Sequence, residues 1–124
     1  MTRDQDVQAF IRATFRSIWS LETLVLLRRD STRWWVRSEI VSALRASDLV
    51  VSQSLERLCI AGLVIVEEPD RARYQPVDAA LENSVEAALN LYARSPDSVR
   101  RMIVAAASPG LAAFADSFRL KKDR

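Results

Sequence analysis

Residues 55–64, which read Leu-Glu-Arg-Leu-Cys-Ile-Ala-Gly-Leu-Val, decide how this chain folds. Leu55 and Leu58 recur at the spacing of an apolar helix face, and Gly62 follows about one turn later. Glycine commonly ends a helix in the left-handed conformation, so the helix is predicted to stop there. Residues 63–66 are apolar and largely β-branched, which predicts a strand directly after the glycine.

The sequence before this stretch predicts a short strand and two helices joined by a tight turn. Residues 33–36 are rich in strand-forming residues, and Ser38 is a suitable cap for a helix over residues 39–45. After the turn, Ser47 or Asp48 caps the helix that ends at the glycine. Two helices separated by a short polar turn are therefore expected immediately before the predicted strand.

A β-hairpin and further helices complete the predicted pattern. Residues 69–72 have the composition of a turn, and residues 73–76 read as the strand that returns from it. Residues 4–29 have helical periodicity, either as one long helix or as two helices with a break near Ser20. Ser95-Pro96-Asp97 marks the start of a later helix, because proline and an acidic residue suit the first turn.

This order of elements resembles the winged helix domains of bacterial transcription regulators of the MarR-like kind. The residues that carry the resemblance are residues 21–27, Trp34-Trp35, Ser38-Glu39-Ile40, Leu44, Val51, residues 55–58 and residues 61–64. The resemblance covers residues 17–77 and implies a winged helix-turn-helix, which is mainly α with a small β-hairpin wing. An N-terminal helix over residues 1–16 and a C-terminal helical extension over residues 78–124 are expected to flank this core.

The resemblance implies a sequence-specific DNA-binding transcription regulator that acts as a homodimer on double-stranded DNA. In such a domain the outward side of helix 48–61 contacts DNA, where Gln53 suits adenine edges and Arg57 suits phosphate or guanine. The resemblance also implies that arginines of the hairpin contact the minor groove or the backbone. The full predicted set of DNA-binding residues is Leu49, Val50, Gln53, Ser54, Arg57, Arg71, Arg73 and Arg37.

An apolar stripe after residue 76 predicts the surface through which two copies associate. Its members recur every three or four residues, which places them on one helix face. A last short helix after Pro109-Gly110 adds Leu111 and two phenylalanines. The predicted dimer interface consists of Leu81, Val85, Leu89, Tyr92, Phe114 and Phe118, with Val77 at the start of the stripe.

A rival hypothesis from another class is a winged-helix module that binds a regulatory protein and not DNA. Leu49 and Val50 are apolar where small polar residues are usual, and Glu56 repels phosphate. The net charge of +2 is modest for a nucleic-acid-binding protein. A basic stripe that joins helix 48–61 to Arg71 and Arg73 would favour DNA, and an apolar patch there would favour protein.

The composition excludes several classes of function. The chain has 124 residues, of which 49% are hydrophobic and 27% charged, and this fits one globular domain. With no histidine and one cysteine, it has neither an internal disulfide nor a Cys/His zinc site. No nucleophile motif or glycine-rich loop is present, so no enzyme, cofactor or metal is expected. The charged start and the short apolar runs predict a cytoplasmic protein without a membrane segment.

Two further side-chain positions are predicted from the pattern. Trp34 and Trp35 are neighbours in a strand, so they point to opposite faces, and one of them anchors the core. Cys59 lies near the core side of helix 48–61, and a buried, inert thiol is expected there.

Overall fold

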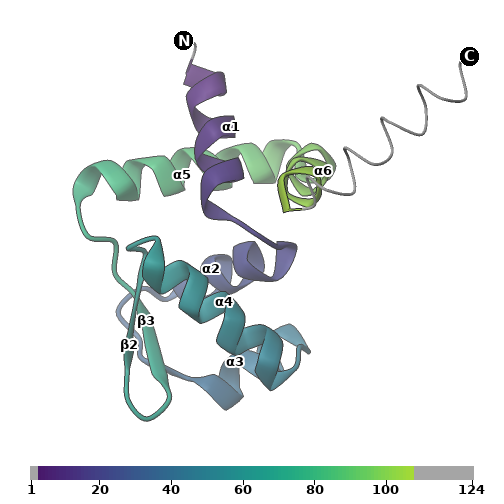
Figure 1. Ribbon diagram of the computed structural model, residues 1–124. Coiled ribbons are helices and arrows are strands. Elements are labelled where there is room, and N and C mark those ends of the chain that lie inside the picture. The colour runs from purple at the N-terminus through teal and green to yellow at the C-terminus, as the bar shows by residue number, and fades with distance from the viewer. Residues whose placement is uncertain (1–2, 108–124) are drawn as a thin grey trace, which may run out of the picture.

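The structure, a computed structural model, describes residues 3–107 and consists of helices around a small antiparallel sheet (Figure 1). The elements are α1 (Arg3–Thr14), α2 (Ile18–Arg29), β1 (Trp35–Val36), α3 (Arg37–Leu44), α4 (Asp48–Ile60), β2 (Val64–Glu67), β3 (Arg71–Tyr74), α5 (Ala79–Arg94) and α6 (Pro96–Ala107). The predicted mainly helical fold with a small hairpin is therefore confirmed. The predicted short helix after residue 110 lies outside the described residues.

Residues 4–29 form two helices, which settles the alternative that the sequence left open. Ser17 caps α2, because its side chain accepts a hydrogen bond from the Ser20 backbone N–H at 3.0 Å. The Ser17 N–H in turn donates to the Ser20 hydroxyl at 3.3 Å. This reciprocal capping satisfies two backbone donors at the helix start. The break therefore precedes Ser17, and Ser20, where the break was predicted, lies within α2.

The helices on either side of the tight turn begin at different kinds of cap. Ser47 caps α4 by accepting from the Val50 N–H at 3.1 Å, which decides between the two predicted caps. The prediction that Ser38 caps α3 is wrong, because α3 already begins at Arg37. The Glu39 carboxylate reaches back instead and accepts from the Val36 N–H at 2.9 Å.

Gly62 joins α4 to the hairpin through a left-handed backbone conformation with φ of +79°. Its N–H donates to the Cys59 carbonyl at 3.0 Å, and the Leu63 N–H donates to the Leu58 carbonyl at 3.0 Å. These two bonds define the Schellman motif, which satisfies carbonyls at a helix end. The chain reverses within this motif, so β2 begins at Val64, directly beside the helix it leaves.

The sheet has the order β1-β3-β2, and both pairings are antiparallel. Ala72 pairs with Trp35 on one side and with Val66 on the other, so these side chains share one face. Trp35 and Ala72 are buried on this inner face, whereas Trp34 is half-buried against the arginines of the outer face. The predicted division of the two tryptophans between core and surface is confirmed.

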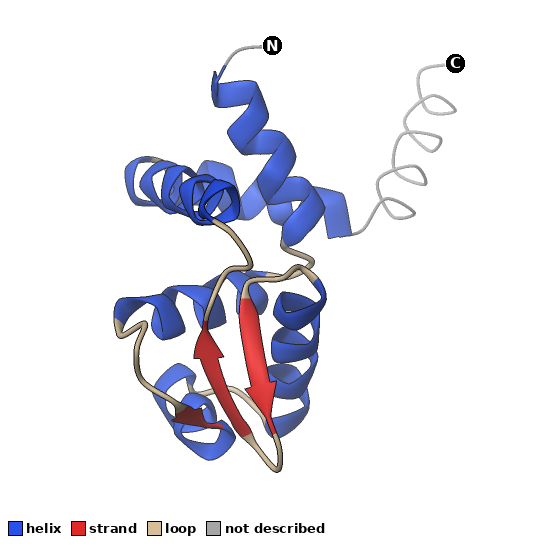
Figure 2. Cartoon of the chain, turned by 90° about the vertical axis from the view of Figure 1, so that its left-hand side faces the viewer, coloured by secondary structure: helices blue, strands red, loops and turns tan. Residues whose placement is uncertain are grey.

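Helices α1, α5 and α6 form a layer above the unit made by α2, α3, α4 and the sheet (Figures 1 and 2). One apolar core runs through both layers. It includes Ile11 and Phe15 before the break, Val85 of α5, and Val99 and Ile103 of α6. The start of α6 at Pro96 agrees with the helix start predicted from Ser95-Pro96-Asp97.

Two polar clusters also join the layers, and each centres on a tyrosine. Tyr74 of β3 donates to the carboxylate of Glu82 in α5, and Arg28 of α2 donates to the same carboxylate at 2.8 Å. Burial, followed by the neighbouring Glu82 carboxylate, raises the pKa of the Tyr74 phenol above its ordinary value. This cluster holds α5 against both α2 and the sheet.

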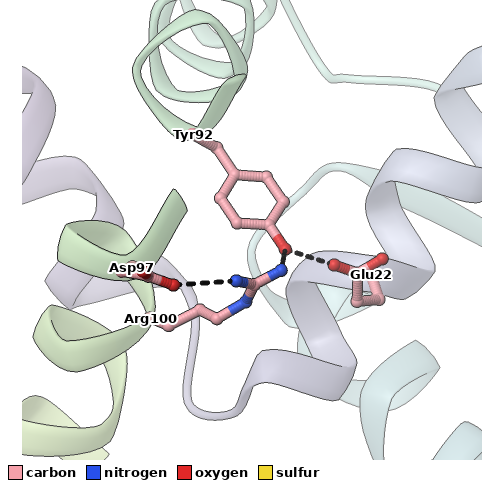
Figure 3. Close-up of polar contacts among 4 residues, drawn as sticks. All are labelled: Glu22, Tyr92, Asp97 and Arg100. Carbon is pink, nitrogen blue, oxygen red and sulfur yellow. Dashed lines mark hydrogen bonds and ion pairs between the residues drawn. The ribbon is translucent and has the colours of Figure 1, made fainter. Parts of the chain in front are cut away.

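The second cluster lies between α2 and the last two helices (Figure 3). Tyr92 donates to the Glu22 carboxylate, and Arg100 donates to the Tyr92 oxygen at 3.1 Å. Arg100 also pairs with Asp97 at 3.2 Å. Burial and the Glu22 carboxylate raise the pKa of Tyr92.

Replacement of Gly62 by alanine is expected to lower the free energy of unfolding by about 1–2 kcal/mol, because a Cβ is disfavoured in the left-handed region. The new Cβ would also lie only 3.3 Å from Cγ1 of Val77. Urea denaturation followed by circular dichroism measures the change. Arg45→Gly is the matched control, because Arg45 has a φ of 55° and glycine relieves strain there. Equal stability of Gly62→Ala and the wild type would contradict this account.

Tyr74 and Tyr92 are the only tyrosines in the chain, so an ultraviolet titration reports on both clusters. Both pKa values are raised by folding, so the stability that the phenols contribute is intact below pH about 10 and is lost above it. We expect little tyrosinate in the folded protein at pH about 10 and half-ionisation in the urea-unfolded chain. Glu22→Gln should lower the pKa of Tyr92 and leave that of Tyr74 unchanged. If both tyrosines of the folded protein ionised at the same pH as in the unfolded chain, the two hydrogen-bonded clusters would be contradicted.

Candidate nucleic-acid interface

Helix α4 presents one exposed ridge to solvent. The ridge consists of Leu49, Gln53, Glu56 and Ile60, which are spaced by three or four residues and therefore share one face. Its two apolar members are largely uncovered, with Leu49 66% and Ile60 70% exposed. The opposite side of α4 is anchored in the core by Val51 and Leu58. Two grooves of unlike chemistry lie on either side of the ridge.

The first groove, which we call the basic groove, lies between α4 and the start of α2 and has a volume of about 320 Å³. Its lining residues are Arg16, Ser17, Trp19, Ser20, Val50, Gln53, Ser54 and Arg57. The lining includes two guanidinium groups and no carboxylate. It combines cationic groups with a half-exposed indole and an amide, which are groups that contact phosphates and bases.

The basic groove brings together several of the predicted DNA-binding residues, namely Val50, Gln53, Ser54 and Arg57. Gln53 is exposed and Arg57 is half-buried. The prediction that the Ser54 side chain faces outward is wrong, because that residue is only 3% exposed. Ser54 lies one helical turn after Val51 and next to Leu55, so the inner face of α4 carries it toward α2.

Sequence reasoning missed the contributions of Arg16 and Trp19 to this groove. Arg16 directly precedes the cap of α2, and Trp19 lies in its first turn. The serine spacing Ser17-x-x-Ser20 is a capping signal that would have placed Arg16 at a helix start. Its proximity to α4 depends on how α2 packs, which no local pattern reveals.

The second groove, which we call the acidic groove, lies between α4 and the hairpin and has a volume of about 420 Å³. Its lining residues are Arg37, Ser52, Leu55, Glu56, Cys59, Ile60, Val66, Glu68, Pro69 and Asp70. Arg37, which was predicted to contact DNA, is half-buried here and donates to the Ser52 hydroxyl at 3.0 Å. The groove thus has an apolar floor with carboxylates along it.

The hairpin arginines lie on the outer face of the sheet, where they stack against Trp34. The guanidinium carbons of Arg71 and Arg73 lie 4.6 and 4.7 Å from the centroid of this ring. Arg71 also pairs with Glu67, and Arg73 donates to Gln75. Alternation along β3 places both arginines opposite Ala72, so they do not join the basic groove. The acidic groove lies between α4 and the hairpin, and within residues 3–107 neither groove lining joins Arg71 and Arg73 to Gln53 and Arg57.

Cys59 is exposed, and the prediction of a buried thiol is wrong. The residue lies on the side of α4 that borders the acidic groove. Leu55 and Leu58 fill the positions facing the core, so the helix turn carries Cys59 away from it.

The predicted dimer stripe on α5 packs within the chain. Val85 is 0% exposed, and Leu81 and Leu89 are partly buried against the same core. Tyr92 is held by its hydrogen bond to Glu22. Val85 therefore has no surface left for a second copy, which corrects its assignment to the interface. Phe114 and Phe118 lie outside the described residues.

Within residues 3–107, no group of three or more cysteine, aspartate or glutamate residues is arranged to hold a metal ion. In the same part of the chain, no helix is both long and apolar enough to span a bilayer. Comparisons of the chain with protein-family models, with curated proteins and with solved structures found no match.

Proposed function

We propose that the chain is a winged helix-turn-helix regulator of transcription that binds double-stranded DNA through α4. The order α2, β1, α3, α4 and the β2–β3 hairpin supports this assignment, because a winged helix has the same succession of elements. The observation that carries the proposal is the basic groove, in which Gln53 and Arg57 of α4 lie beside Arg16 and Trp19 of the α2 segment.

The chemistry of the basic groove divides the contacts between phosphates and bases. Arg16 and Arg57 lie on opposite walls, so each can neutralise a phosphate while α4 lies in the major groove. Gln53 is exposed on the ridge next to this groove, and its amide can make two hydrogen bonds to adenine. Leu49 stands one turn earlier on the ridge and offers an apolar contact to a thymine methyl group.

The hairpin contributes less to phosphate binding than the resemblance implies. Glu67, Glu68 and Asp70 give its end a negative charge. Arg71 and Arg73 are engaged with Trp34, and each such cation–π contact is worth about 0.5–1 kcal/mol at an exposed site. We therefore assign the phosphate contacts to Arg16 and Arg57.

Binding of a protein partner in place of DNA is the second candidate function. The acidic groove favours it, because carboxylates repel phosphate whereas Ile60 and Val66 offer apolar surface. The two candidates use opposite sides of α4, so variants of the basic groove discriminate between them.

Arg16→Ala and Arg57→Ala are expected to weaken binding to every duplex and to reduce the slope of log affinity against log salt by about one unit each. Gln53→Ala is expected to cost roughly 1–3 kcal/mol on the preferred sequence and to relax selection at one base position. Selection from a random duplex library followed by a salt series of fluorescence anisotropy measures both effects.

Arg101→Ala is the matched control, because Arg101 is an exposed arginine on α6, far from α4 in the chain. It should leave the salt slope close to that of the wild type. An Arg57→Ala slope equal to the Arg101→Ala slope would contradict the assignment of phosphate contacts. If the wild type bound no duplex at low salt, DNA binding would be contradicted and the protein-partner function would be favoured.

Two copies are expected on each DNA site, because one recognition helix reads only a half-site of a few base pairs. Sedimentation of the protein with a selected duplex should give two chains per duplex, with half-sites about one helical turn apart. One chain per duplex under saturating protein would contradict the homodimer.

A further inference from the structure

We propose that the acidic groove is a docking site for the C-terminal segment of the same chain, residues 111–122. The groove combines two features that call for a specific occupant. It holds exposed apolar side chains beside one another, and its carboxylates have no cationic partner among the described residues.

The apolar floor of the acidic groove is formed by α4 and the hairpin together. Ile60 is 70% exposed and Val66 is 42% exposed, and both line the groove with Leu55 and Pro69. Val66 points to the same face of the sheet as the buried Ala72, but it lies nearer the turn, beyond the cover of the core. A volume of about 420 Å³ is in the range of sites that enclose several side-chain-sized groups.

The charge of the acidic groove selects a cationic partner. Glu56, Glu68 and Asp70 line it, and none of them forms an ion pair with any cation in residues 3–107. The Arg37 guanidinium is directed to the Ser52 hydroxyl instead. An apolar peptide with basic residues would therefore satisfy both the floor and the carboxylates of this groove.

The C-terminal segment of this chain has that composition. Leu111, Phe114 and Phe118 are spaced by three and four residues, which is the pattern of an amphipathic helix that lies in a groove. Three basic residues of the segment follow Phe118: Arg119, Lys121 and Lys122. The apolar stripe matches the groove floor, and the basic end matches its carboxylates.

Attachment to the same chain favours this occupant over a second copy. Residues 108–124 follow the end of α6 at Ala107, and the sequence has Pro109 and Gly110 there, which are residue types that dominate turns. A segment tethered through a short linker that spans the distance has an effective concentration in the millimolar range. Micromolar protein in solution cannot compete with that value. The docked segment would cover Glu56 and Ile60 beside Gln53. The docking itself does not depend on DNA binding, and only its effect on the access of DNA to α4 rests on the proposed function.

Cys59 is a built-in reporter of this contact, because it is the only cysteine of the chain and it lines the acidic groove. The experiment measures the rate at which N-ethylmaleimide modifies the full-length protein without DNA. Phe118→Ser is expected to raise the rate about tenfold, because loss of a buried phenylalanine lowers the docking equilibrium constant by at least about tenfold. Val104→Ser removes an exposed apolar residue of α6 outside the groove and should leave the rate unchanged.

A groove variant tests the charge complementarity separately. Glu68→Lys should raise the rate of Cys59 modification in the wild-type background. In the Phe118→Ser background it should have no further effect, and this second comparison corrects for any direct effect of the new lysine on the thiol. Equal rates for the wild type and Phe118→Ser would overturn the docking. A wild-type rate that falls between about 1 and 100 µM protein would overturn the same-chain assignment, because it would identify a second copy as the occupant. All these outcomes are independent of DNA binding.

Discussion

The reversal of the chain at Gly62 is the constraint on which the rest of the structure depends. Two backbone hydrogen bonds and one positive φ end α4 and start β2 at the same point. Because the strand returns along the helix, the hairpin must lie beside α4, and Trp35 can then close the sheet against the core. The acidic groove follows from this arrangement, because it lies between α4 and the hairpin.

The upper layer of helices is held by a different kind of interaction. Apolar packing joins α5 and α6 to the lower unit, and each tyrosine cluster adds a directional hydrogen bond across the boundary. Tyr74 links the sheet to α5 through Glu82, and Tyr92 links α5 to α2 through Glu22. The stripe on α5 that resembles a dimer surface in the sequence is consequently used within the molecule.

Local chemistry allowed the sequence to predict the elements, and tertiary packing explains what it did not predict. The caps at Ser47 and Gly62 depend on neighbouring residues only. Gly62 was predicted, and Ser47 was one of two predicted caps. The basic groove joins Arg16 to Arg57 through the packing of α2 on α4, which no local pattern contains. The stacking of Arg71 and Arg73 on Trp34 depends on the register between β1 and β3, and register is set by the whole sheet. Ser38 was predicted as a cap because serine is a favoured residue at helix starts. In the structure α3 begins one residue earlier, at Arg37, and the Glu39 carboxylate accepts from the Val36 N–H.

The two grooves give α4 a cross-section with opposite charge on its two sides. The cations of the basic groove are arginines, and the anions that line the acidic groove are carboxylates. An approaching polyanion is attracted by one side of the helix and repelled by the other. The field therefore orients the encounter before contact, in the way that complementary charges fix the register of other complexes. The carboxylates of the acidic groove lower the affinity of α4 for a polyanion, and they thereby restrict the polyanion to an approach from the side of the basic groove.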